Sequence, residues 1–298
     1  MKSSLHALPC FNSVEKISEV NSGLSQHCFK VYADNKRYFA KTINDNTETF
    51  VSLCANNSNL NPDVIYHDDN WLISQFIDAK NIELSTLSTE NKIEHAINLM
   101  VQCHQLTAQP KELAIKSIIS SLVNNTHYSS LDKTILLQFS EWISLLLNTT
   151  KKGVCCHGDL NFTNILMDKM QKTWLIDYEC ACTAPVEFDL AMFIAVNNLT
   201  KNKVAMIIEQ YKVQSPVNVD PILLNDYLLF CYFINALWYF NRYKDALDIE
   251  NKKALLIQAK AQWFRLQSSL KASDLPLLSR LSIKLTDILT TFDLSEQT

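Results

Sequence analysis

The sequence predicts an α+β protein in which a small antiparallel sheet precedes a larger, mostly helical region. Residues 14–77 contain short runs of β-branched and aromatic residues separated by turn-forming residues, which is typical of strands. Beyond residue 88 the apolar residues keep the spacing of amphipathic helices. No stretch rich in Pro, Gly or Ser divides the 298 residues. We therefore expect one continuous unit with two lobes, residues 1–77 and 78–298.

The first lobe is expected to contain two strand pairs. Residues 29–32 and 37–43 flank the turn-forming sequence Asp34-Asn35-Lys36, which predicts a hairpin. Residues 64–66 and 71–76 predict a second pair. Within the later part of the chain, residues 164–179 are predicted to form a strand, a turn and a second strand. The expected helical segments are residues 47–55, 93–104, 113–124, 132–148, 187–212, 221–244, 250–270 and 275–291.

Composition excludes several classes of protein. Hydrophobic residues make up 47% of the chain and charged residues 19%, which is enough apolar mass for a full core and excludes a mostly disordered protein. The formal charge of −4 argues against a nucleic-acid partner, because such proteins usually present a basic face. The nine cysteines and the lack of a signal-like apolar run near Met1 favour reduced thiols in a cytoplasmic protein.

The most apolar stretch, residues 227–240, is 14 residues long. A helix that spans a bilayer needs roughly 20 apolar residues. We therefore expect a buried core helix and no membrane partner. The oligomeric state leaves no signal in the sequence.

The most informative segment is His157-Gly158-Asp159-Leu160-Asn161-Phe162-Thr163-Asn164, which has the spacing His-x-Asp-x-x-x-x-Asn. After Asn164, a second apolar run ends at Asp177. Kinases use a loop Asp beside the acceptor hydroxyl, an Asn five residues later on a metal ion, and a second Asp on Mg²⁺. Carboxylate and amide oxygens are the hard ligands that Mg²⁺ prefers. The predicted hairpin between Asn164 and Asp177 would bring both to one point, so the pattern favours phosphoryl transfer.

Two other interpretations of this region compete with that one. Asp and Asn are common in turns, but the apolar residues before Asp177 argue against a surface turn. A structural zinc site is the second alternative, but the cysteines lack C-x-x-C spacing, and adjacent ones would point to opposite faces of a strand. Buried reduced thiols are therefore favoured. The residues of this alternative are Cys155, Cys156, His157, Cys180 and Cys182.

Residues 157–166, 175–179 and 187–191 together resemble the aminoglycoside phosphotransferase and choline kinase superfamily. These are small-molecule kinases with a bilobal, protein-kinase-like fold. The resemblance extends over about residues 20–243 and is most specific in the catalytic segment. It implies a catalytic base, two magnesium ligands and two residues that support the loop. In that order, these are Asp159, then Asn164 and Asp177, then His157 and Asp189.

The same resemblance implies a nucleotide site in the first lobe. A short turn with one Gly would cover the phosphates with backbone N–H groups, although the sequence has no G-x-G-x-x-G. Lys41 on the next strand would meet the α- and β-phosphates, and Glu48 is the candidate for its helix partner. Residues 75–77 would form the hinge whose backbone meets adenine. The implied nucleotide-binding residues are Gly23, Ser25, Lys41, Glu48, Gln75 and Ile77.

The acceptor site is expected to involve the aromatic residues at 227–243. A cation prefers an aromatic face, and Trp is the most favourable ring. The sequence Leu237-Trp238-Tyr239-Phe240 resembles the aromatic helix that surrounds the quaternary amine in choline kinases. Core packing is the favoured interpretation for most of these rings, so Trp238 is the best candidate for a ligand contact. Glu179 is the other expected acceptor-binding residue.

The sequence therefore predicts an ATP- and Mg²⁺-dependent kinase that phosphorylates a hydroxyl of a small molecule. The resemblance favours a cationic amino alcohol of the choline, ethanolamine or thiamine kind. An aminoglycoside phosphotransferase is the alternative within the same class, and an inactive nucleotide-binding pseudokinase is the alternative from another class. A protein kinase is disfavoured because the sequence has neither Asp-Phe-Gly nor Ala-Pro-Glu at the required places.

Overall fold

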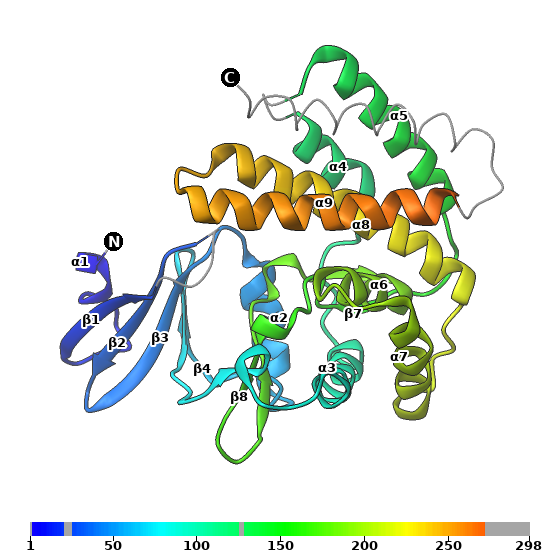
Figure 1. The fold of residues 1–298 in the computed structure, drawn as a ribbon. Helices are drawn as coiled ribbons and strands as arrows, with labels where there is room; N and C mark the ends of the chain where they lie inside the picture. Colours follow the sequence, from blue (N-terminus) through cyan, green and yellow to red (C-terminus); the bar gives the residue numbers. More distant parts are fainter. Residues whose placement is uncertain (1, 21–25, 125–127, 272–298) are drawn as a thin grey trace. The chain divides into compact units, whose positions relative to one another are not determined.

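The structure is a computed structural model that describes residues 2–20, 26–124 and 128–271 (Figure 1). Contacts divide the chain into two compact units, each described here by itself. The first unit comprises Met1–Glu112, Gly153–Asp189 and Ala205–Asn218. The second unit comprises Leu113–Lys152, Leu190–Val204 and Val219–Thr298. The predicted boundary between lobes at residues 77 and 78 stays a prediction.

A five-stranded antiparallel sheet with the order β1-β2-β3-β5-β4 begins the first unit. The predicted hairpin is confirmed: β2 and β3 are joined at Asp34 and Asn35, whose φ angles of 52° and 61° both lie in the left-handed region. Such a two-residue turn matches the twist of the strands that it joins, and Asp and Asn tolerate it well. The strands are β1 (Val14–Val20), β2 (Cys28–Ala33), β3 (Lys36–Thr42), β4 (Val64–His67) and β5 (Trp71–Gln75).

The N-terminal segment covers an apolar cluster on this sheet. Leu5 in helix α1 (Lys2–Leu5), with Leu8 and Phe11 after it, is buried against strand residues that include Val31 and Ile73. The sequence did not predict α1. It also assigned no strand to residues 14–20, because most of β1 is polar and only half-buried, as an outer strand can be.

Helices α2 (Asn46–Asn56) and α3 (Thr89–His104) complete the helical part of the first unit before residue 105. Asp45 and Ser88 cap their first turns by accepting backbone N–H bonds, as N-cap residues do. Both helices agree with the predicted segments.

Short strands then build two small sheets, and these position the catalytic segment. The predicted pair within residues 164–179 is confirmed as two of these strands. One sheet has the order β6-β8-β9 and the other pairs β7 with β10. These strands are β6 (Lys80–Asn81), β7 (Val154–Cys156), β8 (Ile165–Met167), β9 (Thr173–Leu175) and β10 (Cys182–Ala184).

The second unit is helical, and its helices α8 and α9 pack along each other (Figure 1). Asp220 caps the first turn of α8, and Pro221 occupies the first turn, where its missing N–H costs nothing. By length and composition α8 passes the test for a membrane span, but 61% of its most apolar window is buried in the protein, as expected for a core helix. The helices are α4 (Ile115–Val123), α5 (Ser130–Leu146), α8 (Pro221–Asp245) and α9 (Ile249–Lys271).

One helix prediction was wrong, and one lies outside the described residues. Residues 187–212 form two helices, α6 (Val186–Val196) and α7 (Lys201–Gln214), instead of one. Asn198 adopts a left-handed φ of 51°, and the N–H of Leu199 donates to the carbonyl of Ile194, so α6 ends in a left-handed cap. The helix predicted at 275–291 lies in the part of the chain that the structure does not describe.

Candidate active site

A cavity of about 620 Å³ lies in the first unit. Its lining comes from β1, β2, β3, β5 and α2, and from the segments around Asn164 and Asp177. Gln75 and Ile77, the predicted hinge residues, also line it. Gly23 and Ser25 lie outside the described residues.

Among the described residues that line this cavity, Lys41 is the only cation, and it faces three carboxylates. Its Nζ lies 2.9 Å from Glu48 Oε1 and 3.8 Å from Glu179 Oε2, and it pairs directly with Asp177 Oδ1. Although burial by itself lowers it, the charges of Glu48 and Asp177 hold the pKa of Lys41 above its usual value. The predicted pairing of the strand residue Lys41 with the helix residue Glu48 is thus present, and Lys41 is charged.

Asp177 has an uncommon backbone conformation. It follows β9 and has φ 72° and ψ 61°, in the left-handed region that non-glycine residues rarely adopt. The turn directs its carboxylate toward Lys41. Residues held in such conformations cluster at functional sites, where the surrounding structure fixes them.

Asp159 lies in the loop after β7, beside Asn161 and Asn164. Asn161 Nδ2 donates to Asp159 Oδ2 at 3.2 Å, and Asn164 Nδ2 donates to the same oxygen at 3.3 Å. Removal from water raises the pKa of Asp159 to about 7, despite these bonds, and the charges of Asp177 and Glu179 act in the same direction. A carboxylate with a pKa near neutrality is suited to accept a proton from a hydroxyl group.

Asn164 is held so that its side-chain oxygen is left for a ligand. Its Nδ2 also donates to the Asp159 backbone carbonyl at 2.9 Å, so both bonds to Asp159 use the amide nitrogen. Its backbone carbonyl accepts from the N–H of Ile176, which ties it to the residue before Asp177.

The carboxylates around Lys41 form a donor set that fits a divalent cation. Glu48, Asp177 and Glu179 each offer an oxygen atom, and these atoms all lie within 4.8 Å of one another. The set consists of hard oxygen donors, which Mg²⁺ prefers. Glu179 also accepts from Gln26 Nε2 at 2.8 Å, so the structure places it beside Lys41.

His157 supports the loop from inside the protein. It is fully buried, its Nδ1 accepts from the N–H of Asp159 at 3.3 Å, and its Nε2 lies 3.0 Å from the carbonyl of Ile176. Since Nδ1 accepts, the ring hydrogen lies on Nε2 and is donated to Ile176. Burial lowers the pKa of His157, which favours this neutral ring. One imidazole thereby links the loop of Asp159 to the strand that leads to Asp177.

The Asp189 side chain holds the same loop by accepting backbone N–H groups of the loop. The N–H of His157 donates to Asp189 Oδ2 and the N–H of Gly158 to Oδ1, both at 2.9 Å. Gly158 has a φ of 78°, and a Cβ added there would lie 2.1 Å from the carbonyl oxygen of Cys180. Only glycine fits this position.

Three polar residues of this site were not predicted from the sequence. Asn161 accepts the N–H groups of Thr163 and Asn164 and donates to Asp159, so it orders the catalytic turn. Gln26 reaches Glu179, and His104 lies 3.0 Å from Asp189. For Asn161 a signal was present, because Asn side chains in turns commonly hydrogen-bond the backbone two residues further along the chain.

The aromatic residues of α8 belong to the second unit. The ring of Phe233 lies 4.4 Å from that of Phe139, and Phe240 lies 5.7 Å from Tyr128, so these rings pack the core. Trp238 is half-buried, and the Arg242 guanidinium lies 5.2 Å from the centre of its ring. A cationic side chain of the protein therefore already lies over the Trp238 ring.

Comparison with known proteins gives a family and a fold. The family model described as choline/ethanolamine kinase matches residues 12–268. No curated protein sequence matches the chain significantly.

Among solved structures, the choline kinase LicA from Streptococcus pneumoniae aligns with a TM-score of 0.69 at 16% identity, over 88% of this chain and 96% of that one. LicA is also known in complex with AMP. An ethanolamine kinase from Plasmodium vivax aligns with a TM-score of 0.64 at 15% identity, over 89% and 84% of the two chains.

A spectinomycin phosphotransferase aligns with a TM-score of 0.55 at 15% identity, over 94% of this chain and 97% of that one. At these identities the likeness shows the fold, which is kinase-like, as predicted.

Proposed function

Because the chain belongs to the choline/ethanolamine kinase family and is thus a small-molecule phosphotransferase, we propose that it moves the γ-phosphoryl group of ATP to the hydroxyl of a cationic amino alcohol. Choline and ethanolamine are the first candidates. The observation that carries the proposal is the grouping of Lys41, Asn164 and Asp177 in one cavity, with Asp159 hydrogen-bonded to Asn164.

Asp159 is the proposed catalytic base. In the reaction, the acceptor hydroxyl transfers its proton to the Asp159 carboxylate, its oxygen bonds to the γ-phosphorus, and ADP leaves with the electron pair of the broken P–O bond. The pKa of about 7 supports this role, because a base near neutrality accepts the proton readily and releases it again. Asn161 and Asn164 orient the carboxylate.

The charge balance of the cavity supports a metal-dependent nucleotide. Three carboxylates surround one ammonium group, so the site has an excess of negative charge, and a polyphosphate would be repelled. The proposed Mg²⁺ would be held by Asn164 and Asp177 and would supply the positive charge that draws in the phosphates. Lys41 would contact the phosphates directly. The contact of Glu179 with Lys41 favours a place for Glu179 in this cation set over the acceptor role that the sequence suggested.

The acceptor is proposed to be cationic because of the family match and the aromatic content of α8. Trp238 remains the proposed aromatic contact. The predicted alternatives, thiamine and an aminoglycoside, serve as competitors in the test, and the family match favours a simple amino alcohol over them.

The test is a coupled assay of ADP release from Mg·ATP with choline, ethanolamine, thiamine, homoserine and kanamycin as acceptors. Choline or ethanolamine is expected to give the highest kcat/KM, and removal of Mg²⁺ by chelation should abolish turnover. Asp159→Asn, which removes the proposed base, should lose most of the activity. Asp69→Asn is its matched control, because it removes one exposed carboxylate and should keep the activity. Preference for kanamycin or homoserine would overturn the proposed acceptor class.

A further inference from the structure

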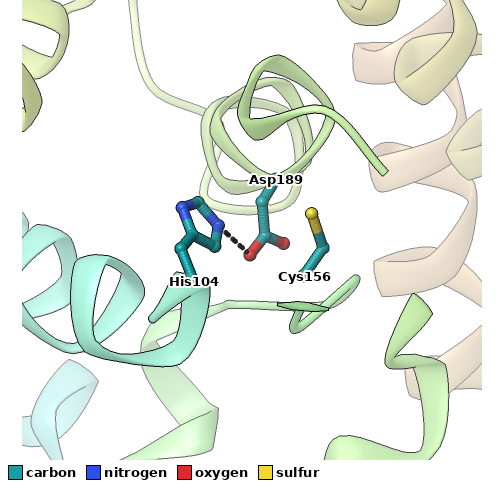
Figure 2. Close-up of side chains that lie close together, drawn as sticks. All are labelled: His104, Cys156 and Asp189. Carbon is teal, nitrogen blue, oxygen red and sulfur yellow. Dashed lines mark hydrogen bonds and ion pairs between the residues drawn. The ribbon is translucent and has the colours of Figure 1, made fainter. Parts of the chain in front are cut away.

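A chain of buried polar side chains joins helix α7 to the loop that carries Asp159. Its members are Tyr211 from α7, His104 from α3 and Asp189 from α6, and all three lie in the first unit. Figure 2 shows His104 and Asp189 pointing toward each other beside Cys156. Tyr211 and Asp189 have no exposed surface, and His104 is 9% exposed.

The distances make the chain continuous. The Tyr211 hydroxyl lies 2.8 Å from His104 Nδ1, and His104 Nε2 lies 3.0 Å from Asp189 Oδ2. The two oxygens of Asp189 then accept the backbone N–H groups of His157 and Gly158. Asp159 is the next residue in the loop.

The chemistry of the groups fixes the positions of the hydrogen atoms. The Asp189 carboxylate only accepts, so the hydrogen between it and His104 is on Nε2. When the ring is neutral, Nδ1 is an acceptor, and the Tyr211 hydroxyl donates to it. Ser215 hydrogen-bonds the Tyr211 side chain in turn. The hydroxyl of Tyr211 therefore selects the one neutral tautomer of His104 that donates to Asp189.

A metal ion is a poorer explanation of the same residues. His104, Cys156 and Asp189 do offer ligand atoms within 4.8 Å of one another. However, burial raises the pKa of the Cys156 thiol well above its usual value, and its Sγ donates to the carbonyl of Ala184 at 3.4 Å. A metal needs a thiolate there, and both carboxylate oxygens of Asp189 are already acceptors.

We propose that Tyr211 is a positioning residue for the catalytic loop, acting through His104 and Asp189. The proposal rests on the proposed role of Asp159 as the base. Without the Tyr211 hydroxyl, Nδ1 of His104 would be a buried acceptor with no donor, which is costly in a nonpolar interior. The hydroxyl would then no longer hold the ring in the orientation in which Nε2 meets Asp189, and the hydrogen bond from His104 to Asp189 would weaken. The grip of Asp189 on the two amides would loosen.

The expected defect is in kcat. Lys41 and the lining of the nucleotide cavity are on other elements, so nucleotide binding should persist. A small displacement of a catalytic group lowers the rate steeply, by up to ~100-fold for about 1 Å. We expect Tyr211→Phe, which keeps the ring, to lower kcat by roughly 5- to 10-fold with KM for ATP within twofold.

The test compares four variants with Mg·ATP and choline. His104→Leu should lower kcat by about 100-fold, whereas His104→Gln, whose amide N–H replaces Nε2–H, should retain most of the activity. Ile97→Val on the same helix is the control, because it is fully buried and makes no polar contact to this chain of residues. Ile97→Val should lower the free energy of unfolding by an amount similar to that of Tyr211→Phe, without loss of kcat. Equal kcat in Tyr211→Phe, His104→Leu and the control would overturn the proposal.

A second readout does not depend on catalysis. Hydrogen exchange of the His157 and Gly158 amides reports directly on the strength of their hydrogen bonds to Asp189. These amides should exchange about 10-fold faster in Tyr211→Phe than in Ile97→Val. If wild-type protein releases no ADP with choline or ethanolamine, the proposed substrate class fails, and the exchange rates still test the role of Tyr211. Unchanged exchange in Tyr211→Phe would refute that role alone.

Discussion

Replacing Lys41 with Met tests the electrostatic core of the proposed site. Methionine keeps much of the side-chain volume and removes the charge that faces Glu48, Asp177 and Glu179. At the 2.9 Å separation from Glu48, the attraction alone is about 6 kcal/mol at an effective dielectric constant of about 20. Much of it offsets the cost of removing both charges from water, and loss of one partner of a buried pair typically costs ~3–5 kcal/mol. We expect a loss of about 3 kcal/mol in the free energy of unfolding.

The assay is thermal unfolding with and without Mg²⁺ at pH 7.5. A protein of this size loses roughly 2–4 °C in Tm for each kcal/mol, so Lys41→Met should unfold roughly 6–12 °C below wild type. Lys116→Met is the matched control, because Lys116 pairs with Glu141 at 2.5 Å with both side chains more than half exposed. A surface pair is worth less than ~1 kcal/mol, so loss of this pair should move Tm by less than about 4 °C.

Mg²⁺ supplies the discriminating observation. Without the competing ammonium group, the carboxylates should hold the ion more tightly, so Mg²⁺ should raise the Tm of Lys41→Met more than that of wild type. Lowering the pH should reduce the defect, because protonated carboxyl groups no longer repel one another. If Lys41→Met and Lys116→Met shift Tm equally and neither responds to Mg²⁺, the reasoning about a cation-centred carboxylate cluster is refuted.

Three further predictions concern single residues. Asp159→Asn should lower kcat by about 10²–10⁴-fold with unchanged Mg·ATP affinity by calorimetry; weakened ATP binding in a folded variant would contradict the role of base. Trp238→Leu should raise KM for choline by about 30-fold and leave KM for ATP unchanged, since a ring face binds a cation by ~2 kcal/mol; a lower Tm with normal kinetics would show core packing instead. Burial and the charge of Asp220 raise the pKa of Asp226 to about 6, so the folded state binds its proton more tightly than the unfolded chain, and stability falls as pH rises from about 4 to about 6. Asp226→Asn should therefore raise Tm at pH 8 by about 2–3 °C, after allowance for solvent screening, and leave it unchanged at pH 4; equal shifts at both pH values would contradict this.

Local patterns predicted the parts of the structure that depend on neighbours in sequence. The hairpin at Asp34 and Asn35 follows from the backbone that these residues tolerate, and the strand pair between Asn164 and Asp177 follows from two apolar runs around a turn. Because this strand pair brings Asn164 and Asp177 together, their spacing in the sequence was enough to predict that they share a site. Lys41 and Glu48 are seven residues apart on adjacent elements, so their pairing could also be predicted from the sequence.

Other features depend on contacts between distant segments. Strands β7 and β10 have three residues each, too few for a periodic pattern, and they pair across 26 residues or more. His104 occupies a core position of an amphipathic helix, and its partners Asp189 and Tyr211 are 85 and 107 residues away. Its spacing alone resembles that of an ordinary apolar residue, so only the folded chain distinguishes it.

Asp159 lies in the catalytic loop and Asp189 binds the same loop, and their different surroundings give the two carboxyl groups different pKa values. Asp159 is removed from water and accepts two long hydrogen bonds from amide groups, and the pKa of its carboxyl rises to about 7. Asp189 is more deeply buried, but hydrogen bonds from His104 and from the backbone hold the pKa of its carboxyl below the usual value. Opposite shifts of this kind separate a group that exchanges a proton from one that stays ionised. Asp189 can therefore anchor the loop while Asp159 changes its protonation, and a donor lost from Asp189 would bring the two carboxyl groups closer in pKa and weaken both roles.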